Sequence, residues 1–319
     1  MLKMPYLARS DNRAILAREN KIYGNPYQWF DTSYFKAQGI YTLSFDFFIN
    51  WRKNCVADEI WVKRLTFEPE RFLSLGCSEV LEEITEIDSK DCLRRLYKFS
   101  KAFDFIAKYM IIPDIPGECW RDFKNKVLSF DLSHTTKEQY ASNSRQTISL
   151  LNANEIQEVI KRLRKEAKSI GAAGLIYATS SLESYLSSKP YFWPGDVDIV
   201  LTDKEGSYVY GIIEIKKHTK ASKIPFHNQT IHNYLKKDNQ KYASLDMLRK
   251  RLSCKFFMLF YSVEPEDRNF IVEEIEEETF NILSRKQYAM PLQHELQSFA
   301  DEIKWRFFHG EQSSERDFF

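Results

Sequence analysis

Asp198, Glu214 and Lys216 are the residues of this chain whose types and spacing could support chemistry. They lie in two segments, 194–201 and 212–217, that alternate charged with aliphatic side chains. Residues 203–206 between them have the composition of a tight turn, so the segments are predicted to pair as adjacent strands. Side chains alternate across a strand, which places these three residues on one face. The opposite face, turned to the core, would carry Ile199, Leu201, Ile213 and Ile215.

This arrangement predicts a cation between two carboxylates. Asp198 and Glu214 would repel each other within a few ångströms, and a divalent metal is the usual counter-charge. Asp196 is expected on the Asp198 face and is a further metal-ligand candidate. Lys216 suits a phosphate or an attacking water better than it suits a core. The alternative is a buried ion pair at an ordinary hairpin.

The sequence pattern of this hairpin resembles the PD-(D/E)xK superfamily of restriction-endonuclease-like nucleases. In the pattern, an acidic residue on one strand is followed by a turn and then by Glu-x-Lys on the next strand. Asp198 matches the acidic residue of the first strand, and Glu214 and Lys216 match those of the second. Pro194 departs from the motif because three residues separate it from Asp198. The resemblance covers roughly residues 153–285 and implies a mixed sheet flanked by helices.

The resemblance implies a metal-dependent phosphodiester hydrolase. Mg²⁺, with Mn²⁺ able to substitute, would be held by Asp198, Glu214 and the backbone carbonyl of Ile215, because hard cations prefer oxygen ligands. Lys216 would orient or deprotonate the attacking water or contact the phosphate. Family members often add a glutamate from the helix before the first motif strand, and Glu158 and Glu183 are the candidates. Each would otherwise be an ordinary surface helix residue.

The charge distribution favours a nucleic-acid partner for the motif segment. Residues 153–255 carry 18 Lys and Arg against 11 Asp and Glu, whereas residues 256–319 carry 6 against 14. A basic segment suits a phosphate backbone. DNA is favoured over RNA because most of the family cuts DNA. The residues expected to contact nucleic acid are Lys220, Lys223, Gln240 and Lys241.

Bulk composition predicts a two-domain protein without a membrane span. Residues 1–150 are expected to form an α+β recognition or assembly domain, and residues 151–319 the catalytic α/β domain. No run of eighteen apolar residues occurs, and the N-terminus does not resemble a signal peptide. The five cysteines include no CxxC pair, which favours reduced thiols and a cytoplasmic location.

Hydrophobic periodicity predicts the elements around the motif. An eleven-residue strand is expected over 41–51, and aromatic residues just before it, including Tyr27 and Trp29, could stack on bases or pack in a core. Asn154 is expected to cap a helix. The acidic run 273–278 is expected to be a solvated helical face. The other predicted elements are a strand over 59–67, helices over 69–109 and 229–252, a linker over 133–149 and a buried strand over 254–262.

These observations predict a Mg²⁺-dependent endonuclease of the kind used in restriction, phage defence or mobile-element processing. A homodimer is expected if both strands of a duplex are cut. The alternative is a non-catalytic nucleic-acid-binding or scaffolding protein that retains the nuclease fold. A DDE-type transposase does not fit, because Asp198 and Glu214 are only sixteen residues apart and a third acidic strand residue is not evident.

Overall fold

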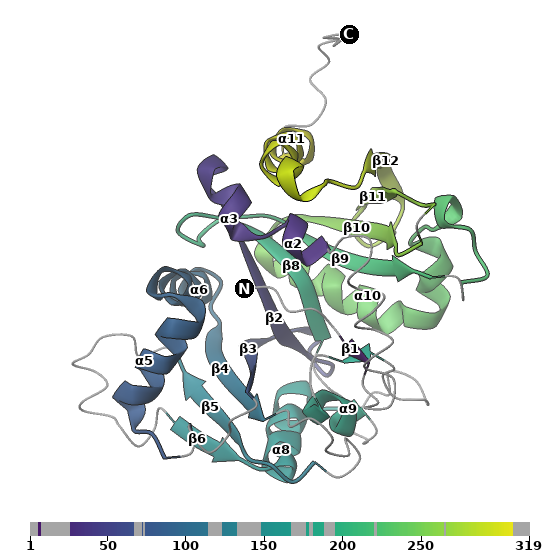
Figure 1. The fold of residues 1–319 in the computed structure, drawn as a ribbon. Coiled ribbons are helices and arrows are strands. Elements are labelled where there is room, and N and C mark those ends of the chain that lie inside the picture. Colours follow the sequence, from purple (N-terminus) through teal and green to yellow (C-terminus); the bar gives the residue numbers. More distant parts are fainter. Residues whose placement is uncertain are drawn as a thin grey trace.

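A ten-stranded mixed sheet forms the centre of the molecule (Figure 1). The structure is a computed structural model. It describes residues 6–7, 26–66, 72, 74–113, 123–132, 148–166, 177–178, 181–187, 195–219, 222–264 and 266–308.

Strands from both halves of the chain lie side by side in this sheet. In spatial order they are β12 (Ile282–Ala289), β11 (Asn269–Ile275), β10 (Lys255–Ser262), β9 (Val209–His218), β8 (Gly195–Asp203), β2 (Ile40–Asn50), β3 (Cys55–Thr66), β4 (Ile106–Pro113), β5 (Val127–Asp131) and β6 (Ile148–Leu151). The pairs β9–β10 and β3–β4 are parallel and the others antiparallel. A separate pair joins β1 (Tyr6–Leu7) to β7 (Tyr177–Ala178). The predicted mixed α/β class is thus confirmed, and β2 of the first half pairs directly with β8 of the second.

Helices cover both faces of the sheet. One apolar cluster joins the sheet to α5 (Cys77–Asp88), α6 (Lys90–Ala102) and α10 (His232–Leu252). On the other face, α8 (Ala153–Arg164) and α9 (Ser181–Ser187) pack at one end, and α2 (Pro26–Trp29), α3 (Thr32–Phe35) and α11 (Leu296–Phe308) at the other (Figure 1). Short 3₁₀ helices are η2 (Lys36–Gln38), η4 (Phe226–Asn228) and η5 (Gln293–Glu295). None of the helices in the described residues has the length and apolar composition of a membrane span.

Several predicted elements appear with shifted boundaries. The strand expected over 41–51 is β2, and the buried strand expected over 254–262 is β10. The helical prediction for 69–109 is wrong at its end, because the apolar, β-branched residues from Ile106 onward form β4, which pairs with β3. Most of the predicted linker, residues 133–147, lies outside the described residues.

The cap of α8 and the acidic run also differ from expectation. Asn152 rather than Asn154 caps α8, because its side chain accepts from two backbone N–H groups while Glu155 bonds back to it. Glu273 lies in β11, not on a helix, and is fully buried. It accepts from the Ile231 N–H at 2.9 Å and pairs with Arg285. These tertiary contacts therefore bury Glu273, although the charged residues around it in the sequence favour an exposed position.

The turn between β8 and β9 requires glycine at residue 206. Gly206 has φ +72°, and a Cβ there would lie 2.9 Å from the carbonyl oxygen of Arg95. Gly206→Ala is expected to lower the free energy of unfolding by about 2–3 kcal/mol, because a left-handed backbone and a steric overlap act together. Gly39→Ala, at φ +74° with no atom within 4 Å of the new Cβ, is the matched control and should cost about 1 kcal/mol. Urea denaturation measures both, and equal losses would contradict the overlap at Gly206.

Candidate active site

The predicted catalytic residues lie where β8 and β9 separate. The two strands pair from Thr202 with Val209 to Ile199 with Ile213. Beyond that point β8 continues along β2, with Asp46 opposite Asp196. In the same region β9 continues along β10, with Met258 opposite Glu214. Asp198 and Glu214 therefore stand at the two sides of a fork in the sheet.

A β-bulge shapes the β8 side of this fork. Leu43 pairs with Val200 and Phe45 with Val197, so β8 has one extra residue opposite Ser44. Val197 and Val200 consequently face the same apolar cluster, and the strict alternation expected for this strand is broken at Asp198 and Ile199. Such bulges re-aim side chains and are frequent beside active sites. The bulge lets the Asp198 carboxylate reach into the fork.

Asp198 is fixed by two hydrogen bonds. Its Oδ1 accepts from the hydroxyl of Tyr27 at 2.8 Å, and its Oδ2 accepts from the Ile215 N–H at 2.7 Å. Burial, then the neighbouring Glu214, raises the pKa of Asp198 to about 8, although Lys241 opposes the shift. Burial and Glu214 therefore disfavour the charged form of this carboxyl, and a bound cation would favour it.

Glu214 is the most buried acid of the fork, with 1% of its surface exposed. Its Oε1 lies 2.7 Å from Lys241 Nζ and 3.2 Å from Lys216 Nζ. Its Oε2 is buried without a hydrogen-bond partner. A buried polar atom without a partner is costly, and a bound cation would remove that cost. This carboxylate oxygen could therefore coordinate a hard cation such as Mg²⁺.

Lys241 lies between two carboxylates. Its Nζ is 2.7 Å from Glu214 Oε1 and 3.3 Å from Asp196 Oδ1. Burial opposes its charge, but Asp196, Glu214 and Asp198 outweigh burial and hold the pKa of Lys241 well above its ordinary value. Burial raises the pKa of Asp196, but Lys241 and Lys63 outweigh burial, and the net pKa is lowered. The chain thus supplies one of the counter-charges that the carboxylates need.

Lys216 is enclosed by α10. Its Nζ lies 3.2 Å from Glu214 and 3.8 Å from Asp238, and 5.4 Å and 5.6 Å from the ring centres of Tyr234 and Tyr242. Asp238 stands at a non-helical kink inside α10. The two rings and two carboxylates stabilise the ammonium while 18% of the side chain stays exposed. Lys216 can therefore act on a bound group from a fixed position.

A second buried ion-pair network adjoins the fork through β2. Lys63 Nζ is 2.7 Å from Asp46 and 3.7 Å from Glu183 of α9, and all three side chains are buried. Burial raises the pKa of Asp46 to about 8 against the opposing charge of Lys63. Asp46 is also opposite Asp196 in the sheet. Glu183 is therefore joined to the site through Lys63 and Asp46.

The other candidates lie in different settings. Glu158 pairs with Lys161 at 3.6 Å on the surface of α8, with 71% of its side chain exposed. Lys223 is exposed, and Lys220 lies outside the described residues. Gln240 of α10 has a buried side-chain oxygen without a hydrogen-bond partner. Lys241 lies against the carboxylates of Asp196 and Glu214, and its contact with nucleic acid stays a prediction.

Four residues of the site were not predicted: Tyr27, Asp46, Lys63 and Asp238. The sequence predicts Tyr27 only as a base-stacking or core residue, and Asp46 only as one residue of the strand expected over 41–51. Their contacts with the fork depend on the pairing of β2 with β8, which leaves no local signal in the sequence. Trp29, by contrast, packs in the core against Phe270 and Phe299.

No protein family, curated protein sequence or solved structure matches this chain. Within the described residues, His, Cys, Asp and Glu do not form a cluster of three or more with the arrangement of a metal site. The function must therefore be inferred from the fork itself.

Proposed function

We propose that this protein is a metal-dependent endonuclease of the PD-(D/E)xK type that hydrolyses phosphodiester bonds, most favourably in DNA. The observation that carries the proposal is the gathering of Asp198, Glu214 and Lys216 where β8 and β9 separate. The parallel strand β10, reached through α10, supports a restriction-endonuclease-like core. The choice of DNA rests on the family resemblance alone.

The residues of the fork can each perform a defined step. Mg²⁺ held by Asp198, Glu214 and the Ile215 carbonyl would neutralise charge on the scissile phosphate and activate water. The unpaired Oε2 of Glu214 supports this assignment, as does the raised pKa of Asp198, which a bound cation would lower. Tyr27 fixes the Asp198 carboxylate by donating to its Oδ1. Lys216 would orient the attacking water or contact the phosphate.

Two finer expectations belong to the same proposal. A homodimer would provide two active sites for cutting both strands of a duplex. A cytoplasmic location would keep the cysteines reduced; Cys55, Cys92 and Cys254 are free thiols.

A non-catalytic nucleic-acid-binding role is the second candidate, and Lys241 is the observation that favours it. Its ammonium already bridges Asp196 and Glu214, so the acids are partly neutralised without a metal. The two candidates differ in whether bound nucleic acid is cut.

A cleavage assay separates them. Purified protein is incubated with plasmid, single-stranded DNA and RNA, each with Mg²⁺, Mn²⁺ or EDTA. We expect cleavage with either metal, none in EDTA, and none by Lys216→Ala. Lys217→Ala is the matched control, because Lys217 is adjacent on β9 and points to the opposite face. Binding without cleavage under every condition would favour the non-catalytic role, and cleavage that persists in Lys216→Ala would remove that lysine from the mechanism.

A further inference from the structure

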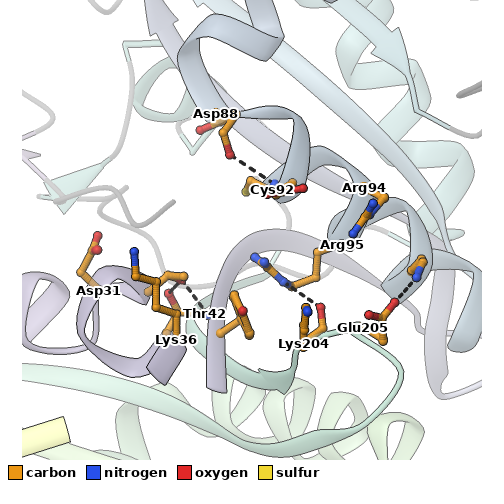
Figure 2. Close-up of a pocket in the computed structure, with 14 residues that line it drawn as sticks. Asp31, Lys36, Thr42, Asp88, Cys92, Arg94, Arg95, Lys204 and Glu205 are labelled. Carbon is orange, nitrogen blue, oxygen red and sulfur yellow. Dashed lines mark hydrogen bonds and ion pairs between the residues drawn. The ribbon is translucent and has the colours of Figure 1, made fainter. Parts of the chain in front are cut away.

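A cavity of about 520 Å³ lies at the opposite end of β8 from Asp198 (Figure 2). Its walls come from α3, η2, the first residues of β2, the start of α6 and the turn after β8. Its volume is in the range of small-molecule sites. The cavity shares no lining residue with the fork.

Arg95 is the unusual group in this cavity. Only 8% of its surface is exposed, its Nε donates to the Lys204 carbonyl at 3.2 Å, and its guanidinium carbon lies 3.6 Å from the ring centre of Tyr41. Among the described residues, no carboxylate pairs with Arg95, and its two Nη groups donate no hydrogen bond. Burial lowers the pKa of Arg95. The Nη groups are not among the buried atoms without a partner, so they open onto the cavity, where they are free to donate to an anion.

Other cations lining the cavity are also unpaired. Lys36, Arg94 and Lys204 are exposed, and none has an ion pair within the described part of the chain. Figure 2 shows Arg95 and Lys204 on one side of the hollow and Lys36 on the other. Together they give the cavity a positive potential that attracts anions.

Most of the acids in the lining are already engaged. Asp88 pairs with Arg64, Glu205 pairs with Lys98, and Asp31 accepts from the Ser33 N–H. Asp91 is exposed and has no such partner among the described residues. Four cations without an ion pair (Lys36, Arg94, Arg95 and Lys204) therefore face two carboxylates without one, Asp31 and Asp91, within the described residues.

The start of α6 adds to the same potential. Ser89 caps this thirteen-residue helix and accepts from the Cys92 N–H, with φ 62° and ψ 150°. Non-glycine residues rarely adopt this conformation, and such strain is concentrated at ligand clamps and active sites. The positive end of a helix dipole favours an anion.

The geometry points to a phosphate-binding site here, for a small phosphate ester of nucleotide size, with Arg95 as the central contact. A guanidinium offers paired donors that match phosphate oxygens. Arg94, Lys36 and Lys204 would complete the contact from the rim. The inference is independent of the proposed nuclease activity.

Calorimetric titration of the full chain in EDTA tests the site with three probes: inorganic phosphate, ADP and adenosine. We expect ADP to bind, phosphate to bind no more tightly, and adenosine not to bind. Equal affinities would identify free phosphate as the ligand, whereas tighter ADP binding identifies a phosphate ester; both support the site. Absence of binding by phosphate and ADP at millimolar concentration would overturn it.

Variants place the binding in this cavity. Arg95→Gln should weaken ADP binding at least about 100-fold, and Arg94→Ala about tenfold, the loss of one charge-assisted hydrogen bond. Arg94 is exposed, so its variant remains informative if Arg95→Gln fails to fold. Lys101→Ala, on the last turn of α6, and Asp198→Asn, in the fork, should bind as the wild type does. ADP binding that is unchanged in both arginine variants would overturn the site.

Discussion

Asp198→Asn is expected to reduce cleavage about 10²–10⁴-fold without reducing stability. An amide has the shape of the carboxylate but cannot neutralise a cation. Its oxygen can still accept from the Ile215 N–H, and its NH₂ can donate to the Tyr27 hydroxyl, which reverses the direction of the wild-type bond but keeps the two groups paired. The substitution also removes a carboxyl whose charged form is disfavoured by burial and by Glu214. Single-turnover cleavage and urea denaturation measure the two effects.

Asp203→Asn is the matched control for this prediction. Asp203 ends the same strand and bonds the turn through the Tyr208 N–H and the Ser207 hydroxyl. Its variant should cleave at the wild-type rate. Wild-type cleavage by Asp198→Asn would refute the catalytic assignment, and loss of cleavage through unfolding would refute the account of its contacts.

Lys63→Met is expected to lower the free energy of unfolding by about 3–5 kcal/mol. Lys63 is buried and pairs with Asp46 and Glu183, so its removal leaves two buried carboxylates without their common counter-charge. A metal-free preparation isolates this effect, and the shift of the urea midpoint measures it.

Two further variants control for the loss of a lysine as such. Lys161→Met removes an exposed lysine that pairs with Glu158 and should cost under about 1 kcal/mol. The double variant Lys63→Met with Asp46→Leu should recover part of the lost free energy of unfolding, because it removes one of the two buried carboxylates that have no counter-charge. A cost below about 1 kcal/mol for Lys63→Met alone would show that the network is not a buried ion-pair cluster.

The part of the site that comes from segments close together in the chain could be predicted from the sequence. Asp198 and Glu214 are joined by a short hairpin whose turn residues and apolar alternation are visible in the sequence, so their proximity followed from local rules. The buried strand β10 and the long helix α10 were predicted for the same reason. Local rules failed at the bulge in β8, because a bulge depends on the partner strand.

The amino-acid sequence by itself therefore determined the α/β class, the hairpin and the proximity of Asp198, Glu214 and Lys216. Tertiary structure alone decided what surrounds them. Tyr27 reaches Asp198 across 171 residues of chain, and Asp46 meets Asp196 through strand pairing. Lys241 turns from an expected surface cation into a counter-ion of the site because α10 packs against β9. Hydrophobic periodicity specifies which face of an element is buried, but not which distant element will cover it.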